Sequence, residues 1–197
     1  MHPLLTITLA LLLMAAVVLG FRRFIRAPKG LSERDPPGLR TVAVFSGDDA
    51  EFFADDRPDE PFRGARLFQR LCEGLASRGV GIENTRTIPY AHWTECVVGR
   101  ERFALVFERH EPQWVAGVEW VPDSAAARRH MALTHQVFSP PDSPDLRRLL
   151  SLLDAWLKSH PALSGVQWHR KEKWLFEDPS EPDEVPIRDA ENGANDR

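Results

Sequence analysis

The chain has 197 residues, of which 43% are hydrophobic and 27% are charged, and its formal net charge is -4 at neutral pH. This composition is typical of an ordinary globular protein, and it excludes collagen-like, wholly disordered and polytopic membrane chains. A chain of this length is expected to bury the core of one domain.

Charge is distributed unevenly along the sequence. Residues 1–40 contain six basic and two acidic residues, whereas residues 177–197 contain eight acidic and two basic residues. The part between these ends is close to neutral. Because binding to a phosphate backbone requires an extended basic surface, we expect no nucleic-acid partner.

The amino-terminal region contains an uncharged apolar run from Leu4 to Phe21. As a helix rising about 1.5 Å per residue, this run is about 27 Å long, close to the hydrocarbon thickness of about 30 Å. The run predicts a single transmembrane helix within an anchor that comprises residues 1–25. The membrane is therefore an expected partner of this chain.

A cleaved secretory signal is the alternative interpretation, since Val18 and Gly20 are small enough to precede a cleavage site. However, the apolar run exceeds the usual length of about 7–15 residues, and no basic residue precedes it. Arg22 and Arg23 follow it instead, and basic residues that flank a span tend to stay in the cytoplasm. We therefore expect a single-pass membrane protein with a cytoplasmic body, and export of the body as the alternative topology.

The segments on either side of the body differ from it in composition. Residues 26–40 are rich in Pro and Gly and basic, which is typical of a linker. Residues 177–197 are acidic and rich in Pro and contain few large apolar residues, so they are expected to be a disordered tail. Residues 41–176 remain as the soluble domain.

Two helices are predicted in this domain. The first extends from Pro61 to about Arg78, with apolar residues three and four positions apart, and Gly79 ends it. The second is marked by Ser143 as its N-cap and Pro144 in its first turn. Each helix has a single apolar stripe, so each must pack against another layer.

Extended runs precede and follow these helices. Thr41–Ser46 is short, β-branched and apolar, and the runs after the first helix alternate in hydrophobicity and are joined by short turns, which predicts an antiparallel meander. The predicted strands are Thr41–Ser46, Trp93–Val98, Arg102–Glu108, Trp114–Val121 and Val166–Arg170, with Val80–Ile88 as a further possibility. In chain order the elements read β-α-β-β-β-α-β. The predicted fold class is α+β: a two-layer sandwich of a mostly antiparallel sheet with two helices on one face.

Cys72 and Cys96 are the only cysteines, which is too few for a disulfide framework. Cys72 lies on the apolar stripe of the first helix and Cys96 lies in a strand, so both are expected to be buried small hydrophobic residues. A disulfide bridge between Cys72 and Cys96 is the alternative.

His92, Glu95 and Cys96 contain the groups used in covalent catalysis. However, residues four apart in a strand are about 13 Å apart, so we expect no nucleophilic site here.

An acidic loop follows the first predicted strand and contains Asp48, Asp49 and Glu51. Carboxylates grouped at the end of a strand are ligands for Mg²⁺ or Ca²⁺. The loop therefore motivates an alternative hypothesis, a metal-dependent hydrolase or phosphoryl-transfer enzyme. A solvated loop is the simpler interpretation, because the residue spacing is not that of a calcium-binding loop.

Tryptophan is the most informative aromatic residue, with six copies against one tyrosine. Trp93, Trp114 and Trp120 lie in the predicted meander and are candidate binding residues, because tryptophan is enriched at interfaces. Packing within the core is the alternative role.

No nucleotide-binding, hydrolase or zinc motif occurs in the sequence, and we expect no cofactor. The sequence thus favours a membrane-anchored, non-enzymatic accessory module that binds another protein.

Overall fold

The structure is a computed structural model, and it describes residues 14, 32–47, 63–110, 112–134, 136–172 and 181–188. Within these residues, no helix is both long enough and apolar enough to cross a membrane. The helix expected at Leu4–Phe21 lies outside the described residues, apart from Met14.

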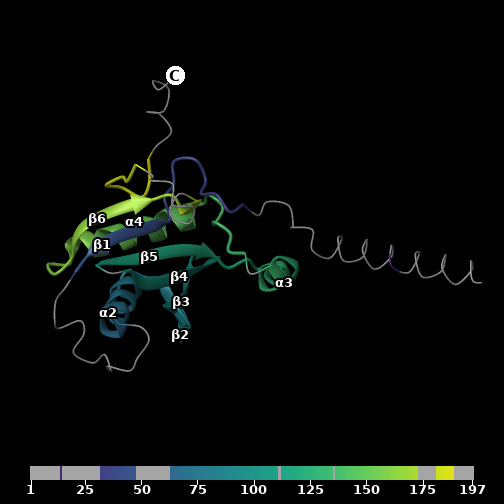
Figure 1. The fold of residues 1–197 in the computed structure, drawn as a ribbon, viewed down its shortest axis with the longest axis horizontal. Helices are drawn as coiled ribbons and strands as arrows, with labels where there is room; N and C mark the ends of the chain where they lie inside the picture. Colours follow the sequence, from purple (N-terminus) through teal and green to yellow (C-terminus); the bar gives the residue numbers. More distant parts are fainter. Residues whose placement is uncertain are drawn as a thin grey trace, which may run out of the picture. The chain divides into compact units, whose positions relative to one another are not determined.

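The described chain contains a six-stranded antiparallel sheet with the strand order β2-β3-β4-β5-β1-β6 (Figure 1). Together with the helices, this sheet confirms the α+β class. The strands are β1 (Val42–Ser46), β2 (Gly81–Ile88), β3 (Ala91–Val98), β4 (Glu101–His110), β5 (Gln113–Trp120) and β6 (Ser164–His169).

Strands β2 to β5 form a continuous meander, because short turns join alternating runs. The predicted meander is confirmed, and β2 adds to it the strand that was only a possibility at Val80–Ile88. Strand β1 lies between β5 and β6 and pairs with both, although it is far from both in sequence. The edge strand β2 contains an irregularity between Glu83 and Arg86, where Asn84 has a φ of 53°. A bulge of this kind and flanking charges hinder pairing with another sheet edge.

Helices α2 (Ala65–Ala76) and α4 (Pro144–Ser159) are the two helices predicted from sequence. The N-cap of α4 is the expected one, since the Ser143 side chain accepts a hydrogen bond from the Leu146 backbone N–H at 3.1 Å. The N-cap of α2 is Gly64 in the left-handed region, with a φ of 90°. A Cβ atom at this position would also lie 2.4 Å from the Trp114 ring, so both conformation and space require glycine.

Both helices contribute to one hydrophobic core with alternate residues of the sheet. Leucines of α2 and α4 pack there with aromatic residues of β1, β4 and β5, including Phe45, Phe107 and Trp114. The two helices approach each other closely at Gly74, where a Cβ atom would lie 2.0 Å from Trp156 Nε1. Close packing of this kind makes the core sensitive to changes of volume.

A third helix, α3 (Ala125–Thr134), was not predicted, because its apolar residues do not form a single stripe. It belongs to a compact unit that is separate from the unit containing the sheet. Ala127 and His130 are its buried residues, and the Thr134 hydroxyl donates a hydrogen bond to the His130 carbonyl at 2.9 Å.

Two segments that the sequence assigned to a linker and to a disordered tail are folded onto the body. Leu39 is fully buried in the core and forms an isolated bridge with Ile187, and Asp183 forms another with Trp168. Asp183 also forms ion pairs with Arg40, at 3.2 Å, and with Arg188. The prediction of a linker is therefore wrong for residues 32–40, and the prediction of disorder is wrong for residues 181–188. Composition did not reveal these contacts, because they join segments far apart in sequence.

Candidate functional site

The two faces of the sheet carry different side chains. On one face, alternate strand residues point into the core beneath α2 and α4. The opposite face carries buried valines, and we call it the valine face, defined by Val42, Val44, Val106 and Val115. These residues alternate with the core residues along β1, β4 and β5, as the pleat of a strand requires.

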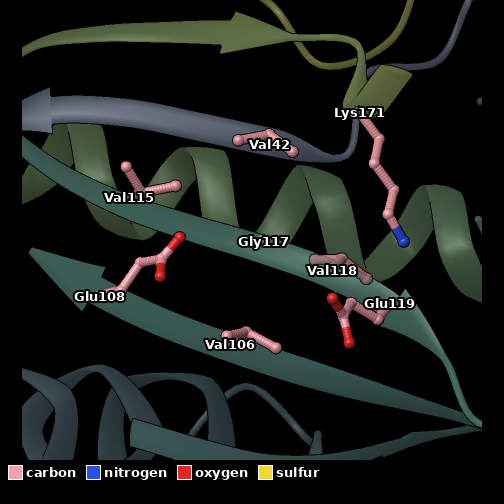
Figure 2. Close-up of a pocket in the computed structure, with 8 residues that line it drawn as sticks. All are labelled: Val42, Val106, Glu108, Val115, Gly117, Val118, Glu119 and Lys171. Atoms are coloured by element: carbon pink, nitrogen blue, oxygen red, sulfur yellow. The ribbon is translucent and has the colours of Figure 1, made fainter. Parts of the chain in front are cut away.

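A pocket lies on the valine face over β1, β4 and β5 (Figure 2). Its volume is about 440 Å³ when the solvent at its mouth is included. The residues that line it are Val42, Val106, Glu108, Val115, Gly117, Val118, Glu119 and Lys171. The lining thus combines aliphatic walls with three ionisable groups, which is the usual composition of a binding pocket.

Gly117 creates the space in this pocket. It lies in the row of paired residues that joins Val42 on β1 to Val106 on β4, at the centre of the face. A Cβ atom at Gly117 would meet no heavy atom within 4 Å in the described chain. The missing side chain therefore leaves a hollow in an otherwise filled row.

The ammonium group of Lys171 is the most unusual feature of the pocket. Lys171 is only 4% exposed, and its Nζ atom has no hydrogen-bond partner among the described residues. Figure 2 shows its side chain extending from the turn after β6 toward the end of the pocket that contains Glu119. A buried donor without an acceptor is costly, about 1–3 kcal/mol or more when charged. Among the described residues, the Lys171 ammonium therefore has an unmet capacity to donate hydrogen bonds.

Burial shifts the pKa values of the ionisable groups in opposite directions. Burial lowers the pKa of Lys171, while attraction by Glu119, Asp35 and Glu33 opposes the change. Burial raises the pKa of Glu119; the Lys171 charge opposes this shift, and Glu108 adds to it. Perturbed groups of this kind in one pocket mark a candidate functional site.

Asp35 fixes the backbone that carries Lys171. The Asp35 carboxylate accepts hydrogen bonds from the backbone N–H groups of Lys171 and Thr41, at 2.9 and 3.0 Å, and from the Thr41 hydroxyl at 2.9 Å. Arg170 donates to the Asp35 carbonyl at 2.6 Å, and Glu172 accepts from the Asp35 N–H at 2.9 Å. Three consecutive residues after β6 are thus bonded to one residue before β1, and the position of Lys171 is determined by the fold.

The structure does not bring the three candidate tryptophans together. Trp114 is fully buried on the core face, where its indole N–H donates to the Gly47 carbonyl at 2.8 Å and its ring stacks on Phe107. Trp120 lies on the same side of β5 and is partly exposed. Trp93 is partly exposed on the other face, with the Arg86 guanidinium 4.3 Å from its ring centre. These residues form no common aromatic surface, and Trp114 has a core-packing role.

The other chemical candidates are separated or lie outside the described chain. Cys96 and His92 lie on the core face, where His92 stacks on Phe68, whereas the Glu95 carboxylate pairs with Arg102 on the opposite face. Cys72 and Cys96 are both free thiols. The acidic loop with Asp48, Asp49 and Glu51 lies outside the described residues, and the described residues contain no group of acidic, His or Cys side chains suited to a metal ion.

The pocket residues carry almost no signal in the sequence that could have identified them. Lys171 lies in a short basic run that is typical of a solvated surface, and nothing in that run signals burial. Gly117 carried a usable signal, because an isolated glycine within a strand pattern often marks a close approach or an open space. Glu119 lies two residues after Gly117 in the same strand, so both face the same side of the sheet. Only the structure shows that Lys171 lines the same pocket as these two residues.

Comparisons with protein-family models, with curated proteins and with solved structures gave no significant match to this chain. The interpretation of its function therefore depends on the geometry of the site.

Proposed function

We propose that this chain is a membrane-anchored, non-enzymatic accessory module whose α+β domain binds a partner protein through the valine face. The observation that carries the proposal is the buried Lys171 ammonium, which has no hydrogen-bond partner among the described residues and lines an aliphatic pocket. A partner that offers an acceptor to this ammonium would remove the energetic penalty of a buried donor that the described residues leave unbonded.

Two further features support a binding role. The core face beneath α2 and α4 is occupied by the packing of the domain itself, so it is not available to a partner. The pocket, in contrast, combines aliphatic contacts with a few polar groups that can orient a ligand, as binding pockets do.

The experiment uses Gly117→Val, which fills the hollow with the side chain already common on this face. The full-length chain is tagged, expressed in its cells of origin and purified from membranes in mild detergent, and co-purifying proteins are quantified by mass spectrometry. Gln113→Val is the matched control, because it adds the same side chain to the exposed start of the same strand, outside the pocket lining.

The proposal expects a stoichiometric partner with the wild type and with Gln113→Val, and at least a tenfold loss of that partner with Gly117→Val. Equal recovery with all three chains would show that the pocket does not contact the partner. Recovery of no partner from the wild type would also refute the proposal.

We also propose that Leu4–Phe21 forms an uncleaved anchor and that the body lies in the cytoplasm. The support is the length of the uncharged run and the basic residues Arg22 and Arg23 after it. Mass spectrometry of the mature amino terminus and reporter fusions after residue 197 test these two points. A mature chain that begins after Gly20, or a reporter active only outside the cytoplasm, would contradict them.

A further inference from the structure

We infer that the pocket on the valine face binds an uncharged peptide segment, which places a short aliphatic side chain over Gly117 and a main-chain amide between Lys171 and Glu119. This inference rests on the proposed function, because it specifies the chemistry of the partner that the valine face would bind.

The charges around the pocket favour a neutral ligand. The Lys171 ammonium offers donors only, whereas the carboxylates of Glu119 and Glu108 offer acceptors. An anionic ligand would bond to Lys171 but would be repelled by these glutamates, and also by Asp35 and Glu33, which interact electrostatically with Lys171. A cationic ligand would bond to the glutamates but would be repelled by Lys171.

An amide satisfies both kinds of group without a net charge. Its carbonyl accepts from the Lys171 ammonium, and its N–H donates to the Glu119 carboxylate. Figure 2 shows Lys171 and Glu119 at the same end of the pocket, with Glu108 at the opposite end. The Glu108 carboxylate also lies 3.1 Å from His110 Nε2, so Glu119 is the principal acceptor for a ligand bonded to Lys171.

The hollow at Gly117 determines the apolar part of the ligand. Val42 and Val106 flank Gly117 in the same cross-strand row, and Val115 lies two residues away on the same face. These methyl groups complement a side chain the size of valine, whose burial against them is favourable. Main-chain amides linked to short aliphatic side chains are the chemistry of a peptide segment.

Three small probes that share an isopropyl group test the inference: N-acetylvalinamide, isobutyrate and isobutylamine. They are titrated into the full-length chain in detergent micelles, and backbone amide shifts of Gly117 and Glu119 are followed by NMR. The inference expects saturable shifts with N-acetylvalinamide and at least tenfold weaker binding of the acid and the amine. Gly117→Val should abolish the shift of the Glu119 amide, and Gln113→Val should leave the shifts of both amides unchanged.

Two substitutions separate the roles of the polar groups. Lys171→Met removes the ammonium and keeps a side chain of similar length, and it should weaken binding of N-acetylvalinamide at least tenfold, since it removes a hydrogen bond from a charged donor. Glu119→Gln keeps an acceptor and should weaken binding less. If Lys171→Met does not give a folded spectrum, a reduced but measurable affinity of Glu119→Gln keeps the inference testable.

The outcomes separate this inference from the proposed function. Tightest binding of isobutyrate would identify an anion site, tightest binding of isobutylamine would identify a cation site, and either result overturns the inference. Failure of all three probes also overturns it. The proposed function fails independently of the probes, if Gly117→Val captures the partner as well as the wild type does.

Discussion

The two faces of the sheet differ in how completely their buried polar groups are hydrogen-bonded and how completely their space is filled. On the core face, the buried indole N–H groups of Trp114 and Trp168 are bonded, to the Gly47 carbonyl and to the Asp154 carboxylate, each at 2.8 Å. On the valine face, a glycine leaves a hollow and the Lys171 ammonium has no hydrogen-bond partner among the described residues. The difference indicates that the core face is filled and bonded by the packing of the domain, whereas the valine face keeps a hollow and a buried ammonium that the described residues do not bond.

The largest expected effect compares two neighbours on β4 that point to opposite faces. Phe107→Ala should lower the free energy of unfolding by about 3–5 kcal/mol, because Phe107 packs in the core against Phe68 and Trp114. Val106→Ala should lower it by only about 1–2 kcal/mol, the value of two buried methyl groups at the pocket. Urea denaturation of both variants measures the difference. Equal losses would show that the valine face is as tightly packed as the core.

The next largest effect concerns the residue that positions Lys171. Asp35→Ala removes the acceptor of three buried hydrogen bonds, so it should lower the free energy of unfolding by about 2–4 kcal/mol. Asp35→Asn is the control, because it keeps one acceptor oxygen and a group that can donate to the Thr41 hydroxyl. Its loss should be about 1 kcal/mol or less. Similar losses for both variants would show that the charge of Asp35, rather than its acceptors, stabilises this region.

A smaller effect of opposite sign is expected for Gly117→Val. Because the φ of Gly117 is not positive and the added side chain meets open space, the variant should be as stable as the wild type or up to about 1 kcal/mol more stable. Thermal unfolding of this variant and of Gln113→Val measures the change. A loss of more than about 2 kcal/mol would mean that the hollow is already filled and that the contrast between the two faces is smaller than described.

The smallest effect is expected in the chemical labelling of the two cysteine thiols, which lie on the core side of the sheet. Burial raises the pKa values of Cys72 and Cys96 from 9.0 to about 12. The folded chain therefore holds these protons more tightly than the unfolded chain, so their contribution to stability is complete below pH 9 and is lost as the pH rises toward 12. Iodoacetamide at pH 8 should label neither thiol in the folded chain and both in urea, as measured by mass spectrometry. Labelling of the folded chain would indicate that the core opens.

Much of the fold could be predicted from sequence, and little of the site could be. Alternating apolar residues identified β3, β4 and β5, and the Ser143 cap with Pro144 identified the start of α4. These signals are local, since they depend on residues within a few positions of one another. The candidate tryptophans show the limit of such signals, because residue type alone did not distinguish buried Trp114 from partly exposed Trp93.

The sequence by itself determined the α+β class, the meander and the two amphipathic helices, because periodicity and caps encode the geometry of each element. Only the tertiary structure decided that β1 lies between β5 and β6, that residues 181–188 fold onto the body, and that Lys171 is buried. The physical reason is the separation of the interacting groups: Asp35 and Lys171 are 136 positions apart, and their environment exists only after the strands have paired. A lysine has no intrinsic preference that indicates burial, so its pKa and its need for a partner follow from the fold.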